Sequence, residues 1–314
     1  MRKYFSLSLL ALIFSSLTLL VSPSEAIAAE PEVREWTFLI FINGNNNLDS
    51  FGDDDLNELE QVGSTDHLHV VVQWASLQRR DVRRMYVTKD SQPQRVNSIE
   101  LANLGPVDMG DWHRLVDFVE WGVKNFPAKR YFIDVWNHGS GWHRDHLFSK
   151  RTDVFFPTDI SHDDISGHAI TTVELGLAMQ AAATAIGHKV DLYGSDACLM
   201  GMLEVASQMA DAVEYFVGSE EVEPAPGWAY GDFLKEWITK PLRPTIEVAK
   251  ILTRTYVRSY EGGSQGRNQV TLSAFDLKRM GAIEHAFTEL AQALATLPSA
   301  ALAEIRGRLA QTQT

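Results

Sequence analysis

Cys198 is the only cysteine among the 314 residues, and it lies where an apolar run ending in small residues meets the start of a helical pattern. A lone thiol has no intramolecular disulfide partner, so it is either a buried small hydrophobe or a free reactive group. His138 stands in Asn137-His138-Gly139, again just after an apolar run. A histidine beside a thiol raises the thiolate fraction and can later protonate a leaving amine, which is the chemistry of a cysteine peptidase.

The elements that must position these two side chains form an alternating pattern of strands and helices. Short apolar runs rich in β-branched and aromatic residues predict buried strands at 36–42, 68–74, 131–136, 190–194 and 215–218. Apolar residues at three- and four-residue spacing predict helices at about 50–62, 111–125, 171–186 and 200–211. The pattern predicts an α/β fold with a mostly parallel sheet covered on both faces, and an antiparallel edge strand at 83–88.

In such sheets, ligands bind outside the carboxyl ends of the strands. His138 follows the run 131–136 and Cys198 follows the run 190–194. If these strands are neighbours, both side chains project into one crevice, where the N–H groups of Gly139 and Cys198 could hold an oxyanion. A position at a helix start would also lower the pKa of Cys198.

The N-terminus has the pattern of an export signal. Arg2 and Lys3 precede an apolar run at 4–21, and Ala26-Ile27-Ala28 has the small residues of a cleavage site. We interpret residues 1–28 as a signal peptide of a secreted or periplasmic protein; a membrane anchor is the alternative. Removal takes away two bases and the acid Glu25, which changes the net charge from −13 to −14. An acidic protein of this kind repels nucleic acid and anionic membranes, so neither is an expected partner.

Four spaced motifs together resemble one known family. They are WNHGSGW at 136–142, DISGHAITTVEL at 164–175, SDACLMGMLEVA at 195–206 and GSEEVEPAPGW at 218–228. In this order they are similar to the clostripain family of cysteine peptidases, which belongs to the structural clan of caspases, legumain and gingipains. The resemblance runs from about Trp36 to Leu277.

The resemblance implies a caspase-like three-layer α-β-α sandwich over residues 29–276, followed by a helical segment at 277–314 that completes the fold or begins a reduced subdomain. It implies that His138 and Cys198 form a catalytic dyad without an obligatory third carboxylate. The expected protein is a monomeric thiol endopeptidase that cleaves protein or peptide substrates after basic residues, with Arg preferred over Lys. A secreted binding or scaffold module that keeps the site in an inactive form is the alternative.

Asp196, two residues before the thiol, is by this resemblance expected to line the primary specificity pocket. A carboxylate at the base of a narrow pocket pairs well with a guanidinium. The alternative is that Asp196 caps the helix expected after it. Glu220 and Glu221, after the run 215–218, either add negative potential to the same cleft or belong to a solvated loop.

The polar stretch 143–168 separates the two catalytic segments. In the resembling family, self-cleavage takes place in a basic loop between histidine and cysteine, which makes Lys150 and Arg151 the candidate autoprocessing site; an exposed charged loop is the alternative. His138, His143 and His146 with Asp145 lack the helical spacing of zinc hydrolases, so we expect no metal in the chemistry.

Calcium is a candidate cofactor only through the resemblance. The acidic cluster Asp49, Asp53, Asp54 and Asp55 lacks the spacing of an EF-hand loop, and a solvated helix start is the other interpretation. The sequence also departs from the family at Asn45, where an Asp is usual.

Overall fold

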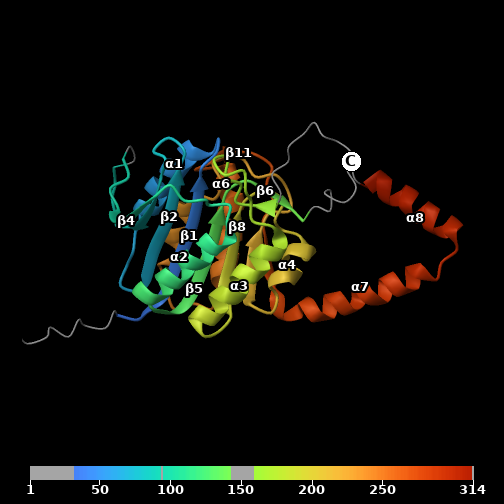
Figure 1. Ribbon diagram of the computed structural model, residues 1–314. Helices are drawn as coiled ribbons and strands as arrows, with labels where there is room; N and C mark the ends of the chain where they lie inside the picture. The colour runs from blue at the N-terminus through green and yellow to red at the C-terminus, as the bar shows by residue number, and fades with distance from the viewer. Residues whose placement is uncertain (1–31, 93–94, 143–158, 313–314) are drawn as a thin grey trace, which may run out of the picture. The chain divides into compact units, whose positions relative to one another are not determined.

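A single eight-stranded sheet organises the chain, in the order β12-β9-β8-β5-β1-β2-β3-β4. The computed structural model describes residues 32–92, 95–142 and 159–312 (Figure 1). The segment interpreted as a signal peptide therefore lies outside the described residues. Five strands of the sheet are mutually parallel: β1 (Arg34–Gly44), β2 (Leu68–Ser76), β5 (Ala128–Trp136), β8 (Val190–Asp196) and β9 (Val213–Gly218).

Antiparallel strands close both edges of this sheet. On one side β2 is followed by β3 (Asp81–Tyr86) and β4 (Ile99–Gly105), and on the other β9 pairs with β12 (Ser273–Asp276). The antiparallel strand predicted at 83–88 is confirmed as β3, but its predicted place at the edge is wrong, because β4 pairs with its outer side. Strand β4 escaped prediction because none of its residues is buried and its alternation between apolar and polar residues does not continue beyond Leu101.

Helices cover both faces of the sheet. One face carries α2 (Trp112–Asn125), α3 (Thr172–Ile186) and α4 (Leu203–Met209), which lie side by side in Figure 1. The other carries α1 (Asp49–Glu60), α5 (Tyr230–Trp237) and α6 (Thr245–Tyr260). Each face has its own apolar core, and the predicted three-layer α-β-α sandwich is confirmed.

The remaining elements are short pairs and a C-terminal helical stretch. Strands β6 (Gly139–Gly141) and β7 (Asp159–Ile160) form one small sheet, and β10 (Glu261–Gly263) and β11 (Gly266–Arg267) form another. The 3-10 helix η2 (Leu277–Arg279) leads into α7 (Met280–Ala295) and α8 (Ser299–Thr312). Among the described residues, no helix is long and apolar enough to cross a membrane.

Local sequence signals explain how the long helix α3 is placed. The Thr171 side chain accepts the N–H of Glu174, and the Glu174 side chain accepts the N–H of Thr171, which is a capping box. Gly187 ends the helix at a φ of +89°, a left-handed conformation that favours glycine. The helix therefore delivers the chain to β8 at a fixed point.

Gly194 of β8 lies where the sheet packs against an aromatic layer. A Cβ at this position would lie 2.7 Å from the Trp228 ring and 3.0 Å from the Phe132 ring. We expect Gly194→Val to lower the free energy of unfolding by about 1–3 kcal/mol through overpacking, measured by equilibrium urea unfolding. Gly281→Ala on α7 is the matched control, because no atom lies within 4 Å of its Cβ position. Equal stability of the Gly194 variant and the wild type would contradict this reading of the core.

Candidate active site

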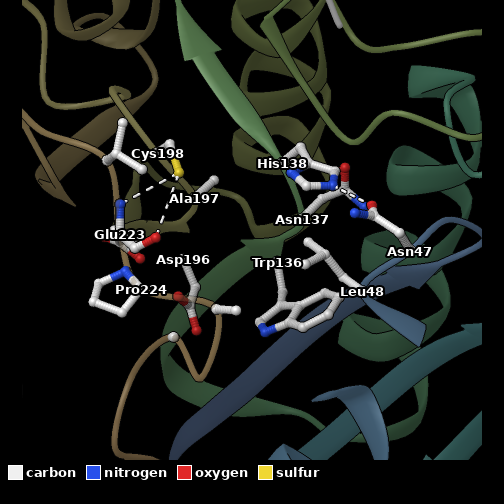
Figure 2. Close-up of a pocket in the computed structure, with 13 residues that line it drawn as sticks. Asn47, Leu48, Trp136, Asn137, His138, Asp196, Ala197, Cys198, Glu223 and Pro224 are labelled. Carbon is white, nitrogen blue, oxygen red and sulfur yellow. Dashed lines mark hydrogen bonds between the residues drawn. The ribbon is translucent and has the colours of Figure 1, made fainter. Parts of the chain in front are cut away.

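A cavity of about 280 Å³ opens at the carboxyl ends of β5 and β8 (Figure 2). Both His138 and Cys198 line it, on opposite sides in the view, and Asp196 lies below and between them. The cavity's lining comes from the last residues of β5 and β8 and from the segments after β1, β5, β8 and β9: Asn47, Leu48, Trp136, Asn137, His138, Asp196, Ala197, Cys198, Val222, Glu223, Pro224, Ala225 and Gly227. The crevice predicted from neighbouring strands is thus present.

The half-buried imidazole of His138 has a defined proton position. Its Nε2 lies 2.7 Å from Oδ1 of Asn47. An amide oxygen only accepts, so Nε2 carries the hydrogen and Nδ1 keeps its lone pair. Burial lowers the pKa of His138, and the nearby His162 lowers it further. The imidazole is therefore a neutral base near pH 7.

The thiol of Cys198 is held by the segment that follows β9. Its Sγ accepts the backbone N–H of Glu223 at 3.3 Å and lies 3.8 Å from the carbonyl oxygen of the same residue (Figure 2). Burial raises the pKa of the Cys198 thiol, and the negative charge of Asp196 adds to the rise. The thiol at rest is consequently protonated near pH 7.

The expectation that Cys198 stands at a helix start is wrong. Helix α4 begins only at Leu203. Between them Leu199 has a φ of +62°, and its N–H is bonded to the carbonyl oxygen of Glu221. This turn holds the chain against the neighbouring loop, so no helix dipole acts directly on the sulfur.

Asp196 is buried at the base of the cavity. Its Oδ2 accepts the backbone N–H of Trp228 at 3.1 Å and the hydroxyl of Tyr230 at 2.8 Å. Burial raises the pKa of Asp196 to about 6. The alternative role as a helix cap is wrong, because α4 begins at Leu203. Gly227 has a φ of +59°, and a Cβ there would lie 2.9 Å from Asp196 Oδ1, so glycine lets the loop close over the carboxylate.

A further buried carboxyl, Glu223, also lines the cavity. Its Oε1 accepts the indole N–H of Trp228 at 3.4 Å. Burial and the charge of Asp196 raise its pKa well above the usual range. Glu220 and Glu221, for which the sequence left a cleft or a solvated loop open, are exposed and do not line the cavity, as expected of the solvated loop.

The departure at Asn45 has a local explanation. The Asn45 amide donates to Oδ2 of Asp163 at 2.7 Å, in a buried setting. An aspartate at position 45 would face that carboxylate with a like charge. Asn45 does not line the cavity, whereas Asn47, two residues later, does. Asn47 follows the carboxyl end of β1, so the rule that pointed to His138 could also have found it.

Other candidate residues are placed away from the thiol or cannot be placed. Lys150 and Arg151 lie outside the described residues, as do His143, Asp145 and His146. In the acidic cluster of α1, Asp49 accepts the N–H of Gln78 at 2.8 Å, and Asp53 pairs with Arg79 at 3.3 Å. Asp55 is instead buried, and the charge of Asp196 contributes to its raised pKa. Within residues 32–92, 95–142 and 159–312, no group of three or more His, Cys, Asp or Glu side chains is arranged to hold a metal ion.

The backbone of Gly139 lies close to that of Cys198. A Cβ on Gly139 would lie 2.4 Å from the carbonyl oxygen of Cys198, so only glycine permits this approach. The oxyanion role of the Gly139 and Cys198 N–H groups stays a prediction.

Comparisons with known proteins give one family match and several structures with a similar fold. The family model described as the clostripain family, peptidase family C11, matches residues 40–309. No match is found among curated proteins.

Solved structures share the fold at low sequence identity. A secreted C11 cysteine protease from Bacteroides thetaiotaomicron, in complex with an irreversible peptide inhibitor, has a TM-score of 0.64 at 21% identity, over 82% of this chain and 71% of that one. A structure of a secreted C11 protease from the same organism, called iotapain, has a TM-score of 0.66 at 15% identity, over 83% of this chain and 71% of that one. An inactive zymogen C11 protease from Parabacteroides distasonis has a TM-score of 0.59 at 17% identity, over 80% of this chain and 64% of that one.

The raised pKa of Cys198 makes a prediction about its reactivity. We expect the rate of alkylation by iodoacetamide to rise with pH with a midpoint above that of an ordinary thiol, about 8.5, because burial disfavours the thiolate. Mass spectrometry after timed quenching measures the rate, and the sole cysteine makes the signal unambiguous. Urea-unfolded protein is the control and should return to the ordinary midpoint. A midpoint below 7 in the folded protein would show a thiolate–imidazolium pair at rest.

The Asn47 contact predicts the tautomer of His138. In ¹⁵N-labelled protein we expect the imidazole signals of an Nε2–H tautomer in the wild type and a mixture of tautomers in Asn47→Ala, since the acceptor is lost. Asn46→Ala is a neighbouring control; its amide donates to the carbonyl oxygen of His162 rather than to His138. An unchanged tautomer in the Asn47 variant would contradict the assigned role.

Proposed function

Because the chain belongs to the clostripain family of cysteine peptidases, we propose that it hydrolyses peptide bonds after basic residues through a dyad of His138 and Cys198. The observation that carries the proposal is the shared cavity, which bears the thiol, a neutral imidazole and the buried carboxyl of Asp196. Arg is the preferred residue before the scissile bond, and Lys is second.

The reaction follows from the protonation states. As the sulfur attacks the substrate carbonyl carbon, its proton passes to Nδ1 of His138, so positive charge develops on the imidazole and negative charge on the substrate oxygen only when the substrate is present. The tetrahedral oxyanion is held by the backbone N–H groups of Gly139 and Cys198. His138 then returns the proton to the leaving amine, which leaves an acyl-enzyme. Water, deprotonated by the same imidazole, hydrolyses this thioester and restores the thiol.

Asn47 serves as the positioning residue of this dyad. Its contact to Nε2 leaves Nδ1 as the basic atom. An amide acceptor orients the ring without adding a charge, so the lowered pKa of His138 is compatible with its presence.

Asp196 selects substrates with a positively charged side chain before the scissile bond. With a pKa raised to about 6, its carboxyl is ionised at neutral pH. A guanidinium can pair with a buried carboxylate through two parallel hydrogen bonds, and an ammonium only as a point charge, which favours Arg over Lys.

Export and maturation complete the proposal. Residues 1–28 direct the chain to the periplasm or the exterior, and two similar structures are described as secreted proteases. Cleavage at Lys150-Arg151 activates the protein; the similar structure described as an inactive zymogen supports a maturation step. Calcium dependence is tested by assay with the ion and with a chelator.

An inactive scaffold is the second candidate function. It is favoured by the bonding of the Cys198 sulfur to Glu223, with a raised thiol pKa, in place of activation at rest.

Fluorogenic peptides ending in Arg, Lys, Asp or Asn test the proposed function. We expect turnover of the Arg and Lys peptides and none in Cys198→Ala. Asp196→Asn should lower kcat/KM for the Arg peptide by at least roughly thirtyfold, the equivalent of about 2 kcal/mol for losing one partner of a buried charge pair. Glu220→Gln, an exposed change of the same charge, is the matched control. Absence of turnover with every peptide, even after limited proteolysis between 143 and 158, would favour the scaffold.

A further inference from the structure

The hydroxyl of Tyr230 bridges two buried carboxyl groups. Its oxygen lies 2.8 Å from Oδ2 of Asp196 and 2.7 Å from Oδ2 of Asp134. A hydroxyl has one hydrogen, and ionised carboxylates only accept. Two hydrogen bonds at these lengths therefore require that one of the two carboxyls is protonated and donates to the tyrosine oxygen.

The surroundings decide which carboxyl holds this proton. Asp134 is completely buried, and its Oδ1 has no hydrogen-bond partner. Asp196 borders the cavity and also accepts the backbone N–H of Trp228. Backbone N–H groups of Asp196 and Val135 lower the pKa of Asp134 in part, but Asp196 has the side chain of Glu223 as a further hydrogen-bond partner and also borders the cavity. A negative charge is therefore better tolerated on Asp196, and the proton belongs on Asp134. Burial, with the charge of Asp196 as a second cause, also raises the pKa of Asp134 well above its usual range.

We propose that Tyr230 and protonated Asp134 are positioning residues for substrate specificity: Asp134 donates to the Tyr230 oxygen, and the Tyr230 hydrogen is thereby committed to Asp196. The inference rests on the proposed role of Asp196 in binding a basic side chain. Without the donor at Asp134, the hydroxyl could turn its hydrogen to either carboxyl. With it, the negative charge stays on the carboxyl that faces the cavity, in one orientation.

The groups around this pair are acids or tyrosines. They come from α1, from the segment after β9 and from α6: Asp55, Glu58, Glu223, Tyr256 and Tyr260. Burial, and next the charge of Asp196, raises the pKa of Asp55 and of Glu223 well above the usual range. Among the described residues, no ion pair joins Asp134 or Asp196 to a lysine or arginine. A cationic substrate side chain would then supply the ion-pair partner of Asp196.

The kinetic test uses Tyr230→Phe, which removes the bridging hydroxyl and keeps the ring. We expect kcat/KM for an Arg peptide to fall about ten- to a hundredfold, mainly through KM, because a hydrogen bond to a charged group is lost. The kcat/KM for a citrulline peptide, in which a neutral isostere replaces Arg, should change little. The rate of alkylation of Cys198 should also change little. Tyr256→Phe is the matched control, because its hydroxyl is buried without a hydrogen-bond partner. Equal losses with Arg and citrulline peptides, or an equal loss in the control, would overturn the proposal.

Two variants of Asp134 distinguish whether its side chain acts as a hydrogen-bond donor or as a negative charge. Asp134→Leu removes the donor and should lower the Arg-to-citrulline ratio as Tyr230→Phe does. Asp134→Asn has nearly the same shape, and its amide can donate to the Tyr230 oxygen, so it should restore most of that ratio. If Asp134 acts as a carboxylate, the Asn variant should be as impaired as the Leu variant, and the proposal is wrong.

An infrared measurement decides the protonation without any turnover. The difference spectrum of wild type minus Asp134→Asn, recorded above the pKa of Asp196, which is about 6, should show the carbonyl band of a protonated carboxyl. A carboxylate band in its place would overturn the inference. If no basic peptide is cleaved but the protonated band is present, the proposed function fails while the hydrogen-bond arrangement stands.

Discussion

The parallel pairing of β5 with β8 is the constraint on which the site depends. In this register Trp136 lies opposite Asp196, and the sequence carries His138 and Cys198 two residues beyond each of them. The equal offset brings His138 and Cys198 to the same edge of the sheet. A change of register by one residue would exchange the two faces of β8 and turn Asp196 away from Tyr230. Helix α3, with caps at both ends, holds that register by delivering the chain to β8.

The cluster of carboxyls beneath the cavity works against stability. A carboxyl whose pKa is raised by folding binds its proton more tightly in the native state than in the unfolded chain. The stability contribution of Asp196 therefore falls as pH rises from about 4, the ordinary value, through about 6 in the folded protein. Asp134 and Glu223 act in the same direction over a wider range, because their pKa values are raised further. Such a group of buried acids with raised pKa values, which lowers stability at neutral pH, is typical of a functional site.

The sequence predicted the elements with strong periodicity and missed those that depend on tertiary contacts. Buried runs gave β1, β2, β5, β8 and β9 because strands covered on both faces are apolar throughout. The start of α4 was placed too early, since nothing in the local pattern shows that Leu199 adopts a positive φ and bonds to Glu221. For Glu220 and Glu221 the sequence left a cleft and a solvated loop open, and it did not single out Glu223, because neighbouring acids look alike in sequence and only packing decides which one is buried.

The site residues divide in the same way. His138, Cys198 and Asp196 could be proposed because they follow strand ends and belong to spaced motifs. Tyr230 and Asp134 lie in α5 and within β5, where an apolar setting predicts only core. Glu223 is the residue that joins both parts: its backbone N–H bonds to the Cys198 sulfur, while its carboxyl adjoins Asp196. Cys198 and Asp196 therefore share one support, and we expect a substitution that displaces the loop after β9 to alter the surroundings of both side chains.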